Sequence, residues 1–272
     1  MEFEIKPKSK FSIGFRELWQ YRELFYFFTW RDIKVKYKQA VLGALWAVIQ
    51  PAAMTLLFTF FFGKVFSATA SNLPYPVYVL SGLLFWNIFS SGLNGAGNSM
   101  ISNANIIKKV YFPRLIIPVS AILSGLPDFI ISFSIFIGLI LYYHVEVSVV
   151  FLLFGLISGL LLTFIATLGM GLWLSALNVK YRDFRYIIPF LIQGLLFVTP
   201  VIYPAQSIDN HTIHVLLSFN PMYCAVESFR MFISGEPVYS ATLIYSMVSG
   251  ITILFGGLYF FRKTENYFAD LA

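Results

Sequence analysis

Long uncharged runs alternate with short charged segments along the chain. Asp, Glu, Lys and Arg are absent from residues 39–63, 65–107, 147–179, 186–208 and 238–261, and residues 115–145 carry only Asp128. A charge at the centre of a bilayer costs about 3 kcal/mol, and a helix needs about 20 apolar residues to cross the hydrocarbon. The pattern therefore predicts a domain of six transmembrane helices over residues 39–262, with spans at about 41–63, 77–98, 116–142, 149–177, 186–202 and 241–261.

The run from Val65 to Ile107 is too long for one span. It begins with a cluster of Ser, Asn and Pro and ends with a cluster of Asn and Gly, residue types that are typical of turns. We therefore expect this run to hold one helix, with its apolar part near Val77–Leu93.

The segments flanking the spans carry their own helical patterns. Residues 1–38 have no apolar core followed by a cleavage site, so they do not form a signal peptide. Phe15, Leu18 and Trp19 recur at helical spacing opposite polar residues, which predicts an N-terminal amphipathic helix at the membrane interface. Between spans five and six, residues 211–219 and 222–233 are too apolar for a free loop and predict two short re-entrant outer helices.

The basic residues choose the orientation of this arrangement. Six spans place both termini on the same side of the membrane. If that side is the cytoplasm, every Lys and Arg lies inside except Lys64 and Arg230, as the positive-inside rule requires. We therefore expect residues 1–38 and the tail, residues 263–272, to be cytoplasmic.

Composition agrees with an all-α membrane protein. Of 272 residues, 58% are hydrophobic and only 12% are charged, about half the share that covers a soluble domain. This excludes a soluble enzyme and a disordered chain, and a single cysteine, Cys224, excludes a disulfide scaffold. The net charge of +6 comes from bases on the predicted cytoplasmic side, so we expect no nucleic-acid partner.

Motifs for catalysis are missing from the sequence. It contains no phosphate-binding loop, no G-x-S-x-G, no H-E-x-x-H and no C-x-x-C, so we expect no catalytic residue, no metal site and no cofactor in this chain. Asp128 is the only ionisable group in a predicted span. A hydrogen bond between helices and a role in transport both remain open for it.

Five motifs follow one another along the chain. They are Trp30–Gln39 (WRDIKVKYKQ), Asn105–Arg114 (NIIKKVYFPR), Leu177–Phe184 (LNVKYRDF), Thr199–Pro204 (TPVIYP) and Asn220–Arg230, which opens with NPMY. Together with six spans, this order resembles the membrane subunits of type-2 ABC exporters, which move lipid-linked polysaccharides or teichoic acids out of bacterial cells.

This resemblance implies partners and sites. It implies a bacterial inner-membrane permease that pairs with a second copy of itself and with two ATPase subunits, which hold ATP and Mg. The segment between spans two and three would be the cytoplasmic coupling helix that contacts the ATPase: Asn105, Ile106, Ile107, Lys108, Lys109, Val110, Tyr111, Phe112, Pro113 and Arg114. A basic cluster would receive the lipid diphosphate at the cytoplasmic entrance, although it could equally serve to anchor the topology: Arg31, Lys34, Lys36 and Lys38.

Aromatic residues form 19% of the chain, more than a helix bundle requires. Sugar C–H faces stack on aromatic rings, so these side chains are candidates to line a glycan conduit. The candidates are Trp46, Phe58, Phe62, Tyr78, Phe85, Trp86, Phe89, Phe197 and Tyr203. Lipid-facing positions explain any single one of them equally well.

Three functions remain open at this level. The first is export of a lipid-linked polysaccharide, and we favour an O-antigen-like polymer over teichoic acid or capsular polysaccharide because the chain carries no appended domain after the last span. The second is an ATP-independent glycolipid flippase or membrane enzyme, with its polar groups drawn from Asp128, Asp209, His211, His214 and Glu227. The third is a structural membrane component, which leaves the Tyr-Phe-Pro-Arg run unexplained.

Overall fold

A computed structural model describes residues 15–38, 43, 45–66, 73–208, 210–235, 240–265 and 268. Every regular element in this part of the chain is a helix, as the sequence predicts. The helices are α1 (Phe15–Gln20), α2 (Arg22–Lys38), α3 (Leu45–Phe66), α4 (Tyr75–Ser102), α5 (Ala104–Ile107), α6 (Ile116–Leu123), α7 (Leu126–Tyr142), α8 (Val149–Lys180), α9 (Phe184–Val198), the 3₁₀ turn η1 (Ala205–Ser207), α10 (His211–Ser218), α11 (Pro221–Ser234) and α12 (Ser240–Thr264).

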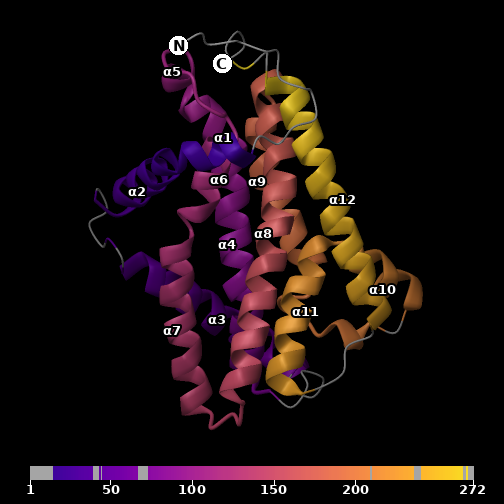
Figure 1. The fold of residues 1–272 in the computed structure, drawn as a ribbon. Coiled ribbons are helices and arrows are strands. Elements are labelled where there is room, and N and C mark those ends of the chain that lie inside the picture. The colour runs from indigo at the N-terminus through magenta and orange to yellow at the C-terminus, as the bar shows by residue number, and fades with distance from the viewer. Residues whose placement is uncertain are drawn as a thin grey trace.

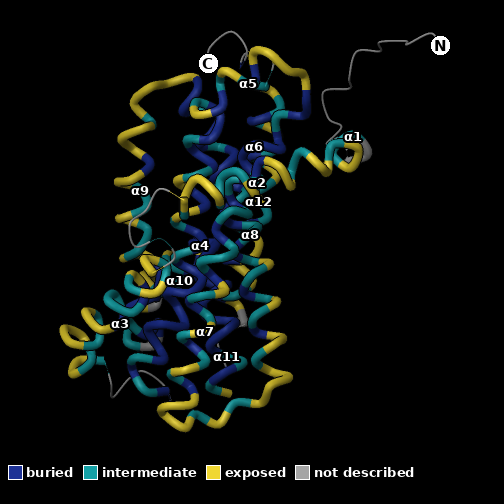
Figure 2. The backbone as a smooth tube through the Cα atoms, turned by 90° about the vertical axis from the view of Figure 1, so that its left-hand side faces the viewer, coloured by how far each residue is buried: buried dark blue, intermediate teal, exposed yellow. Residues whose placement is uncertain are grey.

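Helices α4 and α8 form the centre of the bundle. Helix α8 packs along α4 on one side and along α11 and α12 on the other (Figure 1). Burial follows this order, since 78% of the apolar window of α4 is buried but only 11% of that of α3 (Figure 2). Helix α4 is therefore the core of the protein, whereas α3 lies at its edge.

Five of the described helical segments are long and apolar enough to cross a membrane: Leu45–Phe66, Tyr75–Ser102, Ile116–Tyr142, Val149–Lys180 and Ala241–Thr264. The expected span at 186–202 corresponds to the shorter α9, which begins at Phe184 and ends at Val198. Thr199 then turns to an extended conformation with ψ 135°, because a residue that precedes proline is pushed out of the helical region.

Two helices differ from the pattern that the sequence predicts. Helix α4 continues through the Asn and Gly residues that we expected to form a turn, as far as Ser102. The span expected at 116–142 is divided into α6 and α7 by a turn at Ser124 and Gly125. Pro127 follows in the first turn of α7, where its missing N–H donor causes no loss of a helical hydrogen bond.

Small residues allow α8 and α12 to pack closely. A Cβ atom on Gly169 would lie 2.8 Å from the backbone nitrogen of Leu254, and one on Gly257 would lie 2.5 Å from the carbonyl oxygen of Gly169. Any side chain at these positions would separate the two helices. This is the small-residue contact that is typical of helices in membranes.

Helix α2 lies across the bundle rather than along it (Figure 1). Phe28 is its only buried residue among those described, and it joins a cluster with Phe112, Ile116, Val179 and Phe261. This cluster ties α2, the 107–115 segment and the ends of α8 and α12 together at one end of the molecule. Trp19, Tyr26, Phe27 and Trp30 are more than half exposed, so the other faces of α1 and α2 are rich in accessible aromatic rings.

Candidate functional site

A hollow of about 470 Å³ opens between helices α2, α3, α4, α7 and α9. Its lining combines amides, hydroxyls and one ion pair with a few apolar side chains. The lining residues are Lys36, Tyr37, Gly43, Trp46, Ala47, Gln50, Pro51, Asn87, Ser90, Ser91, Asn94, Asp128, Ser132, Pro189, Ile192 and Gln193. Polar groups at this depth in an apolar bundle mark a path for substrate or ions more often than a structural need.

Helix α4 supplies one polar wall of the hollow. Asn87, Ser91 and Asn94 are spaced at three and four residues, so they share one face of the helix, and Ser90 lies beside them. The amide of Asn98 continues this face one turn further and donates to the Asn94 carbonyl oxygen at 2.9 Å. Amides and hydroxyls both donate and accept hydrogen bonds without carrying charge, which suits a ligand rich in hydroxyl groups.

Asp128 lies in the hollow with two partners from α2. The Lys36 ammonium group forms an ion pair with one carboxylate oxygen, and the Tyr37 hydroxyl donates to the other. Burial is the main cause that raises the pKa of Tyr37 above its ordinary value, and the hydrogen bond to Asp128 is the second. The phenol therefore stays protonated. The carboxylate therefore joins α7 to the C-terminal end of α2.

The four basic residues predicted at the entrance lie along α2 with different partners. Arg31 pairs with its neighbour Asp32 at 2.8 Å and stacks over the Phe28 ring at 4.8 Å. Lys34 and Lys38 are exposed, and Lys36 alone among the four lines the hollow. The structure thus brings one of these bases into the hollow and leaves two at the surface beside it.

The predicted coupling segment, residues 105–114, forms a short helix and a loop at the end of the bundle that carries the Phe28 cluster. Ile107 and Phe112 are buried and anchor the segment, with the Phe112 ring 5.7 Å from that of Phe28. Asn105, Lys108 and Lys109 are exposed, as are Val110 at 58% and Tyr111 at 72%, while Ile106 and Arg114 are half-buried and Pro113 is buried. A smaller hollow of about 280 Å³ lies within this segment.

The nine predicted conduit aromatics fall in different environments. Trp46 lines the hollow and is 54% exposed. Phe85 and Phe89 are buried in the core on the opposite side of α4, Trp86 is buried in the same core, and Tyr78 is buried against Arg230. The rest lie at the margin: Phe58 packs against the core, Phe62 stacks on Phe66, Phe197 is exposed, and the Tyr203 hydroxyl donates to the Phe197 carbonyl oxygen at 3.0 Å. Of the nine, only Trp46 faces the hollow in this structure.

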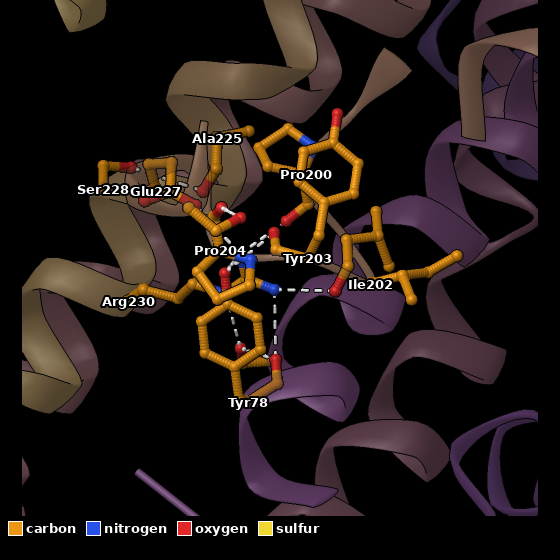
Figure 3. A network of polar contacts seen from close by, with 12 residues as sticks. Tyr78, Pro200, Ile202, Tyr203, Pro204, Ala225, Glu227, Ser228 and Arg230 are labelled. Carbon is orange, nitrogen blue, oxygen red and sulfur yellow. Dashed lines mark hydrogen bonds and ion pairs between the residues drawn. The ribbon is translucent and has the colours of Figure 1, made fainter. Parts of the chain in front are cut away.

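The sequence analysis did not predict the buried ion pair between Glu227 and Arg230. It placed Arg230 in an outer segment only. The two side chains are 3% and 4% exposed and lie 2.9 Å apart on α11. The guanidinium group also donates to the Val201 carbonyl oxygen at 2.9 Å and to the Tyr78 hydroxyl at 2.6 Å (Figure 3). Arg230 therefore fastens α11 to α4 and to the chain that follows α9.

Two polar groups of the alternative flippase or enzyme, Asp128 and Glu227, lie on different helices and have different partners. Asp128 pairs with Lys36, and Glu227 pairs with Arg230. The Asp209 residue and the His211 side chain lie outside the described part of the structure. Within the described residues, no group of three or more His, Cys, Asp or Glu side chains could hold a metal ion.

Comparison with known proteins identifies a family and several relatives that this chain resembles. Residues 23–233 match the family model of the ABC-2 type transporter, a range that contains the hollow and all five motifs. The chain is 28% identical over 257 residues to the O-antigen export system permease protein RfbA of Myxococcus xanthus, which covers 94% of this chain and 97% of that relative. A Klebsiella pneumoniae protein of the same name is 27% identical over 266 residues, 97% and 98% of the two chains. The polysialic acid transport protein KpsM of Escherichia coli is 26% identical over 240 residues, 87% and 91% of the two chains.

The family match extends over most of the chain, and the relatives align over nearly their whole lengths. It confirms the resemblance that the five motifs indicate. The apolar helices, the polar hollow and the motifs thus belong to one kind of protein: the chain is a member of the ABC-2 type transporter family.

Proposed function

We propose that this chain is the membrane permease of an ATP-driven exporter that moves a lipid-linked, O-antigen-like polysaccharide across the bacterial inner membrane. The observation that carries the proposal is the hollow whose lining includes a row of uncharged amides and hydroxyls, with Trp46 at its wall, in a chain of this family. A glycan offers many hydroxyl groups to such a lining and apolar sugar faces to the indole ring. The names of the Myxococcus and Klebsiella relatives support this substrate class.

The proposed topology has six crossings. In chain order helix α9 is the fifth crossing, continued by the turns at residues 199–203, and both termini lie in the cytoplasm. Supporting this orientation, the 107–115 segment, α2 and the ends of α8 and α12 share one end of the bundle, where basic residues are frequent. Helices α1 and α2 then lie at the cytoplasmic interface, and α10 and α11 return into the outer leaflet.

The permease works as a homodimer in this proposal. The hollow is bordered by α3, which buries little of its surface in this chain, and by α9, on which Tyr186 and Phe190 are 80% and 77% exposed. A second copy that packs its α3 and α9 on these helices would complete the wall around a polymer. An isologous interface of this kind is the commonest solution for two identical chains.

Two ATPase subunits supply the energy, and they hold ATP and Mg, whereas this chain needs no cofactor of its own. Residues 105–114 are the coupling segment. Buried Ile107 and Phe112 fix the segment to the bundle, while Val110 and Tyr111 offer an apolar surface beside two lysines. Such a surface, with apolar centre and charged rim, suits a protein partner.

The lipid diphosphate enters from the cytoplasmic leaflet beside the C-terminal half of α2. Lys34, Lys36 and Lys38 lie there, next to the hollow, and Arg31 lies one turn before them. Each base near an anionic membrane surface contributes about 1 kcal/mol of attraction. The cluster would thus bring the lipid-linked end of the glycan to the hollow.

Co-purification with the ATPase tests this function. The permease and the ATPase encoded beside it, expressed together and placed in lipid nanodiscs, should form one complex with vanadate-sensitive ATP hydrolysis. Cells that lack the permease should accumulate the lipid-linked glycan on the cytoplasmic side of the membrane, and the wild-type chain should restore its export. A chain that binds no ATPase, or export that continues without it, would refute the proposal.

A capsular polysaccharide is the second candidate substrate. The observation that favours it is the 26% identity to the polysialic acid transport protein KpsM. Identification of the glycan that accumulates in cells without the permease separates the two, because an acidic capsular polymer and an O-antigen differ in composition.

A further inference from the structure

Two contacts with the bundle bracket the C-terminal half of helix α2. Near its middle, the Phe28 side chain is 2% exposed and packs in the cluster with Phe112. Near its C-terminal end, Lys36 and Tyr37 both contact the Asp128 carboxylate of α7. The residues between these two contacts include Lys34 and Val35, which are exposed. The carboxylate therefore holds the C-terminal half of α2 against the wall of the hollow.

The Lys36 ion pair is accessible to a competing anion. The Lys36 side chain is 45% exposed and that of Asp128 is 23% exposed, and both line the hollow. A diphosphate carries more negative charge than one carboxylate and presents several acceptor oxygens, so it makes stronger charge-assisted hydrogen bonds to an ammonium group. Lys34 and Lys38, exposed on the same helix, would add to its attraction.

The end of α2 leads through Gly43 to α3, a helix that is little buried and contains a proline. Gly43, in the turn between α2 and α3, has a φ of 46°, and Trp46, Ala47, Gln50 and Pro51 of α3 line the hollow. Pro51 donates no backbone hydrogen bond, which weakens α3 at that point. Helix α3 is also little buried and packs against α4 and α7 on one side only.

We propose that Asp128 is the counter-anion that a diphosphate displaces from Lys36, and that this exchange releases the C-terminal half of α2 from α7 and opens the hollow. The inference rests on the proposed function, since the diphosphate is that of the lipid-linked substrate. Asp128 is then a positioning residue: it keeps Lys36 at the mouth of the hollow and keeps the mouth closed until the anion arrives.

A binding cycle tests the exchange. The complex of permease and ATPase in phosphatidylcholine nanodiscs is titrated with a polyprenyl diphosphate that carries no glycan. Asp128→Asn should tighten binding about twofold to fivefold, the range expected when a partly exposed ion pair no longer competes. Lys36→Gln should weaken binding, and adding Asp128→Asn to Lys36→Gln should produce no gain. Two results would overturn the proposal: Asp128→Asn tightens binding even in the Lys36→Gln background, or it does not tighten binding when Lys36 is present.

Inorganic diphosphate in solution is the second arm of the titration, because it offers the same anion without the lipid. It should bind Lys36 by the same exchange but more weakly than the polyprenyl form. Binding of equal strength would remove the lipid-linked substrate from the exchange and contradict the proposal. If the wild-type complex binds neither probe, the proposed function fails as well, whereas binding that ignores Asp128 refutes only the exchange.

Release of α2 is measured on a chain that keeps Lys36 and Asp128, which also covers the case in which Asp128→Asn does not fold. Spin labels are placed at two exposed positions, Val35→Cys on α2 and Ile130→Cys on α7, in a Cys224→Ser background. The polyprenyl diphosphate should shift the distance between the labels to longer values. An unchanged distance at saturating diphosphate would refute the release of α2.

Discussion

The Glu227–Arg230 pair predicts a large loss of stability when one partner is removed. In Arg230→Gln, the Glu227 carboxylate loses its counter-ion at a site that is 3% exposed. The carbonyl oxygens of Pro200 and Val201 lose a charged donor at the same time. Glutamine is too short to replace these contacts, and the guanidinium group that lies 3.6 Å from the Tyr78 ring centre also disappears.

The size of the stability loss in Arg230→Gln follows from the burial of the pair. Removal of one partner of a buried ion pair costs about 3–5 kcal/mol, because the other charge stays in a medium of low polarity. For a chain of this size, 1 kcal/mol corresponds to about 2–4 °C in Tm, so Arg230→Gln should lower Tm by about 6–20 °C. The double variant Glu227→Gln/Arg230→Gln should lose less stability than the two single variants lose together, since no unpaired charge remains.

The assay is the fraction of permease that stays monodisperse after heating, read by fluorescence-detected size exclusion. Arg262→Gln is the matched control: Arg262 pairs with Glu265 at the same i,i+3 spacing and 2.7 Å, but the two side chains are 16% and 17% exposed. Its loss in Tm should be at most half that of Arg230→Gln, because water screens the pair. Equal losses in the two variants would refute the claim that burial makes the Glu227–Arg230 pair important.

Three further predictions concern packing, coupling and the hollow. Gly169→Ala, whose methyl group would meet the backbone of α12 at 2.8 Å, should lower the free energy of unfolding by about 1–3 kcal/mol. The control Gly138→Ala, whose methyl group would meet no neighbouring atom within 4 Å, should change it by less than about 1 kcal/mol. Similar values for the two variants would contradict the close contact of α8 and α12. Tyr111→Ala, which removes a ring that is 72% exposed, should weaken association with the ATPase about tenfold in a pull-down titration, and unchanged affinity would exclude Tyr111 from that interface. Asn94→Leu in the hollow should reduce glycan export to about a tenth without loss of folded protein. The control Ser134→Leu, at an exposed position of α7 outside the hollow, should export normally. Normal export by both variants would show that Asn94 is not on the path of the glycan.

Much of the fold could be predicted because charge is costly in a bilayer. The spans expected from the runs with few charges agree with α3, α4, the α6–α7 pair, α8 and α12 within a few residues. Shorter features could not be placed by that argument, since proline changes the backbone without changing hydropathy. Pro200 ends α9 at Val198, and the turn before Pro127 divides one apolar run into two helices.

The Glu227–Arg230 pair shows a different limit. The sequence places Arg230 on a predicted re-entrant outer helix, residues 222–233, but does not indicate which elements that helix packs against. The burial of Arg230 depends on the carbonyl oxygens of Pro200 and Val201 and on Tyr78, which are far away along the chain. One local signal was present: Glu227 precedes Arg230 by three residues, so the two share one face of a helix.

The polar wall of the hollow, in contrast, is visible in the sequence once α4 is known to continue to Ser102. Asn and Gly near residue 94 suggest a turn in a soluble protein, because water can solvate the backbone of a turn. Within a bilayer, an uncharged run has no such solvent, so the backbone stays helical and the polar side chains of Asn87, Ser91, Asn94 and Asn98 align on one side. The opposite side carries Phe85 and Phe89 into the core. In an uncharged span, Asn and Ser at helical spacing therefore indicate a polar cavity better than aromatic rings do, since rings are equally at home in the core, in lipid and beside a glycan.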